Sequence, residues 1–131
     1  MFGNGKKTPP IRSLIGEGTV VRGDVSYTEG LRVDGEVHGD VTGSGEGSIL
    51  VISDKAKVHG RVKGAHVIIS GEVLGPLEST QLLELHAKAK VVGDVRYELL
   101  EMHPGAVIDG ELRPIRSAEK PALTLAASNE S

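Results

Sequence analysis

The chain has 131 residues, enough for one domain of ordinary size, and it contains no cysteine, which excludes disulfides and thiolate metal sites. Its only Phe and Tyr residues are Phe2, Tyr27 and Tyr97, so its core must consist of Val, Ile and Leu, which favours strands stacked in layers. The net charge is −3, and residues 14–114 hold 10 basic and 16 acidic residues, a balance that argues against nucleic-acid binding.

Residues 1–13, MFGNGKKTPPIRS, have no periodic pattern and contain a Pro-Pro pair, so we interpret them as a flexible arm. No apolar run approaches the roughly 20 residues of a transmembrane helix, and the N-terminus lacks the apolar stretch of a secretion signal. We therefore expect a cytoplasmic protein.

The segment Leu31–Val41, LRVDGEVHGDV, alternates strictly between small or aliphatic residues and polar or charged residues. This period of two is typical of a half-buried β-strand. Gly35 and Gly39 fall on the apolar side, where a narrow corner leaves no space for a side chain. A strand that bends at glycine and resumes the same alternation favours a chain that coils into a solenoid.

The same phrase, written V-x-G-[DER]-V, recurs along the chain. Its glycine stands at Gly23, Gly39, Gly60, Gly75, Gly93 and Gly110. The repeat divides into six windings, 14–30, 31–48, 49–64, 65–80, 81–97 and 98–114. A short fixed period of strands and turns predicts a β-solenoid in which strands of successive windings pair in parallel. The Gly/Ser-rich insert Thr42–Ser48 predicts a bulging loop.

The aliphatic residues of each winding are expected to point inward and stack. The expected inward set is Val33, Val37, Val41, Ile49, Val51, Val58, Val62, Val67, Ile69, Val73, Leu77, Leu83, Leu85, Val91, Val95, Leu100, Met102 and Leu112. After Pro114 the pattern stops, and we interpret residues 115–131 as a flexible tail.

The two terminal windings are expected to lack a cap, because neither flank contains an amphipathic helix. Uncapped strand edges are templates for further pairing, so the sequence predicts end-to-end self-association. If both ends are used, the assembly does not close and a filament grows. The expected contact residues are Ile15, Val20, Val21 and Val25 at one end, and Leu99, Leu100, Met102, Val107 and Ile108 at the other.

No motif in the sequence indicates catalysis, a cofactor or a metal. His38 and His59 lie between inward residues and are expected to face solvent, and Gly16-Glu-Gly18 lacks the frame of a phosphate-binding loop. We therefore predict no catalytic, cofactor-binding or metal-binding residues and no nucleotide.

The opening SLIGEGTVVRGDV (Ser13–Val25), the segment Leu31–Val41 and the repeated phrase resemble the bactofilins, a family of bacterial polymer-forming cytoskeletal proteins. The resemblance covers residues 12–114. It implies a single all-β domain, a right-handed parallel β-helix, with disordered tails. It also implies nucleotide-independent, non-polar filaments that lie on the cytoplasmic face of the inner membrane and scaffold cell-wall or cell-shape machinery.

Two family features bear on particular residues. The arm MFGNGKK (Met1–Lys7) matches the family's membrane-targeting start, with Met1 and Phe2 as the apolar and Lys6 and Lys7 as the cationic contacts. Family members often use a Phe in the C-terminal contact. This chain has none there, so we expect Leu99, Leu100 and Met102 to take that role.

The arm also has a plain physical interpretation. Phe2 is worth about 1.5–3 kcal/mol if fully buried in the acyl boundary, and Lys6 and Lys7 about 1 kcal/mol each near anionic lipid. A single arm therefore binds marginally, whereas a filament that carries many arms binds firmly. The alternative is that 1–13 is a solvated tail.

Two other functions remain open on the residues alone. Ile15-Gly-Glu-Gly-Thr-Val20 superficially suits a left-handed β-helix enzyme, such as a trimeric hexapeptide acyltransferase or a γ-type carbonic anhydrase. Against this, apolar residues do not recur every six positions. A soluble adaptor that does not polymerise is the third possibility, and handedness and oligomeric state separate the three.

Overall fold

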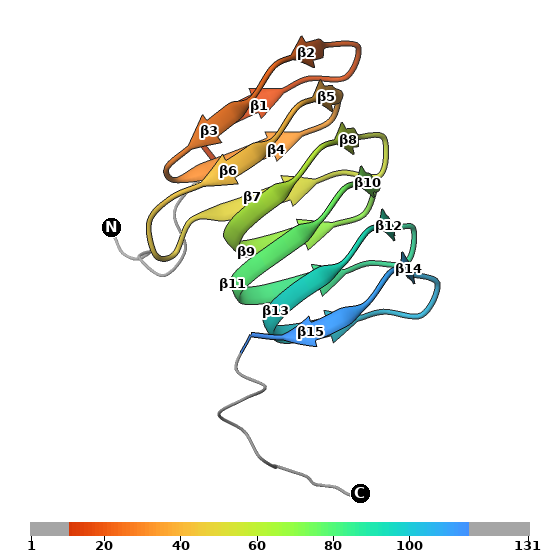
Figure 1. The fold of residues 1–131 in the computed structure, drawn as a ribbon. Coiled ribbons are helices and arrows are strands. Elements are labelled where there is room, and N and C mark those ends of the chain that lie inside the picture. Colours follow the sequence, from red (N-terminus) through yellow and green to blue (C-terminus); the bar gives the residue numbers. More distant parts are fainter. Residues whose placement is uncertain (1–10, 116–131) are drawn as a thin grey trace, which may run out of the picture.

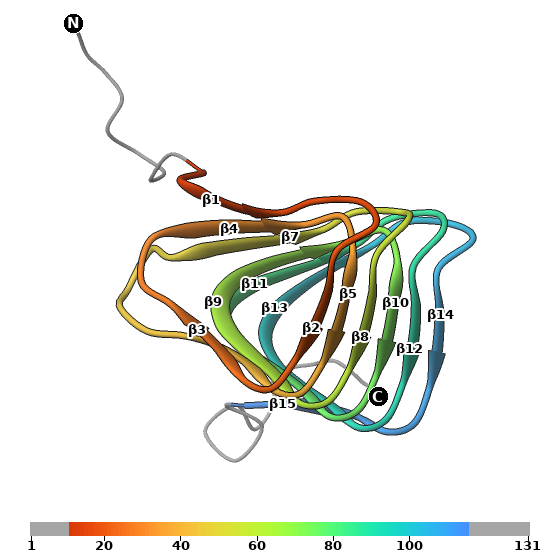
Figure 2. The ribbon, with the colours of Figure 1, turned by 90° about the horizontal axis from the view of Figure 1, so that it is seen from above.

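A computed structural model describes residues 11–115, which form β-strands joined by turns and contain no helix. Every strand pairs with its neighbours in parallel, and the chain rises through six stacked windings (Figure 1). Viewed from the N-terminal end, the chain runs clockwise as it recedes, so the coil is right-handed (Figure 2). The predicted right-handed parallel β-solenoid is confirmed, and its hand is opposite to that of the left-handed enzyme alternative.

Each winding is triangular in cross-section, and its strands contribute to three faces (Figure 2). Face 1 contains β1 (Ser13–Ile15), β4 (Gly30–Val33), β7 (Ile49–Ile52) and the later parts of β9 (Val62–Ile69), β11 (Leu77–Leu85) and β13 (Val95–Met102). Face 2 contains β2 (Val20–Arg22), β5 (Glu36–His38), β8 (Lys57–His59), β10 (Glu72–Leu74), β12 (Lys90–Val92) and β14 (Val107–Asp109). Face 3 contains β3 (Val25–Tyr27), β6 (Val41–Gly43), the first parts of β9, β11 and β13, and β15 (Leu112–Pro114).

The interior of the coil is a column of aliphatic side chains from all three faces. Val33, Val37 and Val41 of the second winding are fully buried, as the alternation of Leu31–Val41 predicts. The expectation for β7 is wrong, because Leu50 and Ile52 are fully buried whereas Ile49 and Val51 lie on the outer side. All four residues of β7 are aliphatic, so alternation could not indicate which pair points inward.

The six recurring glycines form one column along the corner between face 2 and face 3. A Cβ atom built on Gly39, Gly60, Gly75, Gly93 or Gly110 would lie 2.1–2.6 Å from the carbonyl oxygen of the glycine one winding before. No real Cβ atom tolerates so short a contact. The repeat therefore requires glycine because the windings approach closely at this corner, as the sequence predicts.

The corner between face 3 and face 1 changes shape along the coil. In the first two windings it is a separate loop, and the loop between β6 and β7 contains residues 44–48 of the predicted insert Thr42–Ser48, whose first two residues belong to β6 instead (Figure 2). The buried ring of Tyr27 fills this corner, because a Cβ on Gly43 would lie 2.3 Å from its Cζ and a Cβ on Gly64 2.6 Å from its hydroxyl oxygen. From Gly64 onward the corner tightens, and β9, β11 and β13 bend through it without a break.

Candidate polymerisation surfaces

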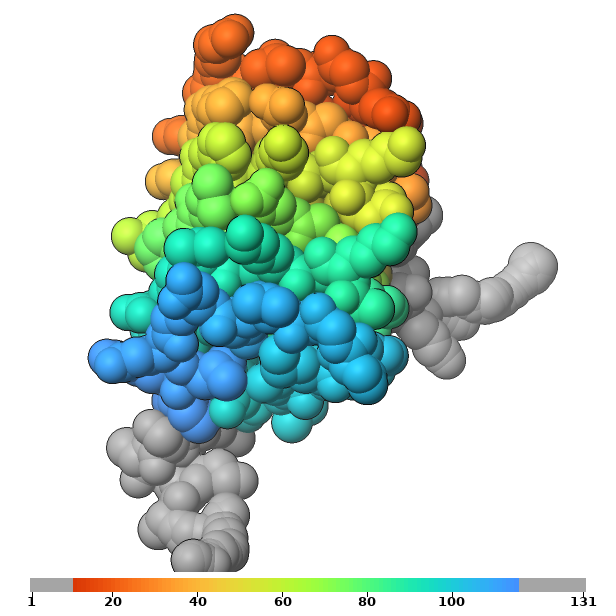
Figure 3. All heavy atoms as spheres, turned by 90° about the vertical axis from the view of Figure 1, so that its right-hand side faces the viewer, coloured from red at the N-terminus to blue at the C-terminus, as the bar shows by residue number. Residues whose placement is uncertain are grey.

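The first and last windings each present a row of strands that pair on one side only within residues 11–115. At the N-terminal end these are β1, β2 and β3, and at the C-terminal end the later part of β13, β14 and β15. Figure 3, which looks onto face 2, shows the windings as successive bands from the first to the last. Unpaired backbone N–H and C=O groups at such edges are available for another chain.

The exposed large hydrophobic residues of the described chain gather at these two ends. They are Ile11 (44% exposed), Leu14 (61%) and Val20 (45%) at the N-terminal end, and Leu99 (62%), Met102 (44%), Val107 (52%) and Leu112 (43%) at the C-terminal end. No residue of the four inner windings belongs to this set, so the apolar surface coincides with the unpaired strand edges.

Residues of two inward columns, one on face 1 and one on face 3, show why the ends are exposed. Met102 stacks on Leu85, and Leu112 stacks on Val95, yet Leu85 and Val95 are fully buried. The difference is that, among residues 11–115, no winding follows Met102 and Leu112. Covering an aliphatic side chain completely is worth about 1.5–3 kcal/mol, so a second subunit on this end would stabilise the contact substantially.

The predicted contact residues divide into three groups, one of which is Met102 alone, an inward residue that is nevertheless exposed. Five residues of the end windings are half-buried, point inward and pack on the core of the coil: Ile15, Val21, Val25, Leu100 and Ile108. Val20, Leu99 and Val107 are exposed and lie on the outer side of their strands, beside the inward Val21, Leu100 and Ile108.

Sequence reasoning placed Leu112 in the core and missed its exposure, although its position in the last winding was a signal that no residue covers it. Residues Met1, Phe2, Lys6 and Lys7 lie outside the described part of the chain.

Polar side chains bind the windings together between the two ends. The Oδ1 atom of Asp24 accepts a hydrogen bond from the backbone N–H of Asp40 at 2.9 Å, and Asp40 in turn accepts one from the N–H of Arg61 at 3.0 Å. Asp94 repeats this contact with Glu111 at 3.1 Å. The aspartate that follows Gly23, Gly39 and Gly93 therefore satisfies a backbone donor in the next winding.

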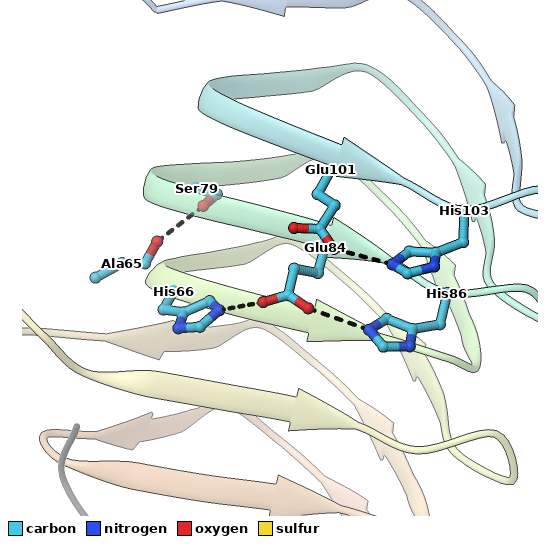
Figure 4. Close-up of polar contacts among 7 residues, drawn as sticks. All are labelled: Ala65, His66, Ser79, Glu84, His86, Glu101 and His103. Atoms are coloured by element: carbon cyan, nitrogen blue, oxygen red, sulfur yellow. Dashed lines mark hydrogen bonds and ion pairs between the residues drawn. The ribbon is translucent and has the colours of Figure 1, made fainter. Parts of the chain in front are cut away.

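A cluster of histidines and glutamates lies on face 1 near the C-terminal end (Figure 4). Nε2 of His66 lies 2.8 Å from Oε2 of Glu84, and Nε2 of His86 lies 3.2 Å from Oε1 of the same carboxylate. Burial raises the pKa of Glu84, but the two histidine hydrogen bonds outweigh this effect and hold the pKa below its usual value. His86 also stacks on His103 with ring centroids 4.6 Å apart.

The geometry of these histidines does not indicate a metal centre. Within residues 11–115, no three His, Asp or Glu side chains converge in a way that could hold a metal ion. His38 is exposed and meets the half-buried His59 edge to face, with ring centroids 4.8 Å apart. The described strands and turns also include no helix that could cross a bilayer.

A parallel solenoid whose most exposed large apolar residues, within residues 11–115, lie at two ends with unpaired strand edges defines a class of protein suited to end-to-end association. The Bactofilin family model, described as polymer-forming cytoskeletal, matches residues 13–113. The chain belongs to the bactofilin family and is therefore a polymer-forming cytoskeletal protein.

Two proteins of Myxococcus xanthus (strain DK1622) are similar to this chain. Bactofilin BacP is 30% identical over 117 residues, which cover 85% of this chain and 48% of BacP. Bactofilin BacO is 26% identical over 100 residues, which cover 76% of this chain and 77% of BacO. The chain thus spans about half the length of BacP and most of BacO. No solved structure matches the chain.

Proposed function

We propose that this protein assembles end to end, without nucleotide, into non-polar filaments held by contacts between like ends. The observation that carries the proposal is that the exposed aliphatic residues of the described chain gather at the two windings whose strand edges are unpaired. At a contact between like ends the two edges run antiparallel, so both partners contribute the same strands. Alternating N-terminal and C-terminal contacts then extend the polymer without limit.

The proposed cellular role is a scaffold on the cytoplasmic face of the inner membrane that positions cell-envelope or cell-shape machinery. The arm that contains Phe2, Lys6 and Lys7 would supply the membrane contact, since it combines an aromatic ring with cations that anionic lipids attract. Each filament carries one arm per subunit, so polymerisation raises the avidity of a contact that is weak for one arm. The partners are other copies of this chain, anionic lipid and cell-wall synthesis or remodelling proteins.

The test is negative-stain electron microscopy of the purified protein without nucleotide or metal, across a concentration series. Six windings of about 4.8 Å give each subunit a length of roughly 29 Å. Contacts between like ends double the structural repeat, so filament diffraction should show a spacing of about 58 Å. A protein that stays monomeric at every concentration would refute polymerisation.

Charged substitutions among the inward residues of the first and last windings test which ends meet. Val21→Asp should block the N-terminal contact and Met102→Arg the C-terminal contact, because both place a charge among the exposed inward residues of an end winding. With like-end contacts, each single variant retains one end contact and joins in end-to-end pairs, and the double variant forms no end contact. Head-to-tail contacts would instead remove every end contact in both single variants. Leu74→Glu, on the outer side of face 2 in the fourth winding, is the control that should leave filaments intact.

A further inference from the structure

The outer side of face 1 carries a patch of aliphatic residues in the middle of the coil. Ile49 and Val51 point outward from β7, Ile68 from β9 and Leu82 from β11, and all four are half-buried. The parallel register places Val51 directly beside Ile68, and Leu82 beside Leu99 in the next winding. Between windings four and five the register instead sets Ile68 beside Glu84 and Leu82 beside His66, so the patch spans windings three to six around this hydrogen-bonded polar pair.

The other two faces differ from face 1 in these central windings. The outward side of face 2 carries an alternating ladder of Glu36, Lys57, Glu72 and Lys90, in which each charge stands beside an opposite one. On face 3, Lys63, Glu78 and Arg96 take the outward positions at the same level. Face 2 also carries the outward aliphatic pair Leu74 and Val92, but face 1 has more outward aliphatic residues than either other face, which indicates that it contacts another protein surface.

Charges at the two ends of face 1 have opposite sign. Arg12 and Arg32 occupy the first two windings, and Glu84 and Glu101 occupy the last two. Arg32 uses its Nε for Asp34 at 2.9 Å, and its guanidinium has further donors in the same fork. Each arginine also has an acidic neighbour, Glu29 beside Arg12 and Asp34 beside Arg32, so face 1 offers arginine donors near the N-terminal end, aliphatic residues in the middle and carboxylates near the C-terminal end.

We propose that face 1 binds face 1 of a second copy of this chain, with the two solenoid axes antiparallel. The arrangement has a two-fold axis that runs along the strand direction, between the third and fourth windings. The second winding of one copy then lies against the fifth winding of the other, and Arg32 faces Glu84 of the partner copy. Val51 packs against Ile68 of the partner copy, and each such contact occurs twice.

The charge distribution selects the antiparallel arrangement. If the axes were parallel, each winding would face its own equivalent, and both Arg32 and Glu84 would oppose themselves. Like charges held face to face disfavour binding, whereas the antiparallel arrangement pairs opposite charges around an aliphatic centre. Two sheets packed in this way lie about 10 Å apart, close enough for the aliphatic side chains to interdigitate.

The contact leaves both ends of the coil free. A filament assembled through its ends would therefore display face 1 along its length, and two filaments would join side by side through many weak copies of the contact. This consequence for filaments rests on the proposed function, whereas the contact itself does not. Because the two contacts use different residues, they can be tested separately.

The first experiment uses the double end variant Val21→Asp/Met102→Arg and measures its monomer–dimer equilibrium by analytical ultracentrifugation. The antiparallel contact predicts dimers that persist in this background. Arg32→Glu places like charges opposite each other at two symmetric positions and should weaken the dimer about tenfold. The exchange Arg32→Glu/Glu84→Arg restores opposite charges and should recover the dimer. Circular dichroism spectra and thermal melting confirm that each variant is folded.

The second experiment compares wild-type, Ile68→Glu and Leu74→Glu filaments by electron microscopy. Ile68→Glu should give single filaments of normal length, and Leu74→Glu, an equally half-buried outward residue of face 2, should leave them paired. Raising the salt concentration should separate the wild-type pairs while the filaments persist, because only the lateral contact depends on opposing charges.

Three outcomes would overturn the lateral contact. The first is paired filaments of Ile68→Glu like those of the wild type, and the second is failure of the charge exchange to recover the dimer. The third is single wild-type filaments in solution whose face 1 variants lose only vesicle binding, which would assign face 1 to the membrane. If the end variants instead form filaments, the proposed end contacts fail, and the wild-type and Ile68→Glu comparison still decides the lateral contact.

Discussion

The glycine column predicts that Gly60→Ala is strongly destabilising. A Cβ at this position would lie 2.1 Å from the carbonyl oxygen of Gly39, and a tolerable contact needs at least 3.0 Å. The second and third windings would therefore have to separate by about 0.9 Å at this corner. Gly60 suits this test because its φ lies outside the left-handed region, so the substitution adds a steric clash without backbone strain.

The magnitude follows from the contacts that flank Gly60. The backbone N–H of Gly39 donates to His59 over 3.1 Å, and that of Val41 donates to Arg61 over 2.8 Å. A separation of this size breaks both bonds, each worth about 0.5–1.5 kcal/mol. The overpacking itself costs a further 1–3 kcal/mol or so. We expect the free energy of unfolding to fall by about 2–5 kcal/mol.

The assay is urea denaturation followed by far-UV circular dichroism, repeated at several protein concentrations because polymerisation would stabilise the folded state. Gly16→Ala is the matched control, since its Cβ meets nothing within 4 Å and its φ is also outside the left-handed region. Gly16→Ala should be neutral or slightly stabilising. Equal urea midpoints for Gly60→Ala and Gly16→Ala would refute the close packing of the column.

Three further predictions address other parts of the chain. Tyr27→Phe should raise the free energy of unfolding by about 1 kcal/mol, because the buried hydroxyl of Tyr27 has no hydrogen-bond partner, whereas Tyr27→Ala should lower it by about 3–5 kcal/mol; urea midpoints decide both. The pKa of Glu84 is lowered in the folded state, so its hydrogen bonds stabilise the fold fully above the unfolded pKa of about 4.3, and this stabilisation is lost as the pH falls through the folded pKa. Glu84→Gln should remove this part of the acid dependence, which is measured as the melting temperature against pH. Deletion of Met1–Lys7 should leave filaments intact in electron micrographs but abolish their co-sedimentation with anionic vesicles, and continued co-sedimentation would assign the membrane contact to another surface.

Most of the fold could be predicted from the sequence because its signals repeat. The alternation of Leu31–Val41 and the six glycines are local patterns, and each recurs at nearly the same spacing, so an error in one winding is corrected by the others. The exception is β7, where Ile49, Leu50, Val51 and Ile52 are all aliphatic. The insert before β7 also interrupts the spacing, so the sequence offered no register from which to decide.

The candidate ends could be predicted only in part. That the first and last described windings have strand edges without a partner within residues 11–115 follows from where the repeat begins and stops. Which side chains are exposed there depends on which positions lack a neighbour in the next winding, and this is a property of register. Leu112 illustrates the difference, because it has the same chemistry as the buried core residues and differs only in having no winding beyond it.

The sequence by itself determined the repeat, the parallel coil and the glycine column, because these depend on patterns within one or two windings. Only the tertiary structure decided which residues from distant windings share a surface. The pairing of Tyr27 with Gly43 and Gly64 depends on exact stacking, since the ring occupies space that these glycines vacate. The opposite charges at the two ends of face 1 likewise appear only when separate strands are placed in register, because single-winding patterns carry no information about that alignment.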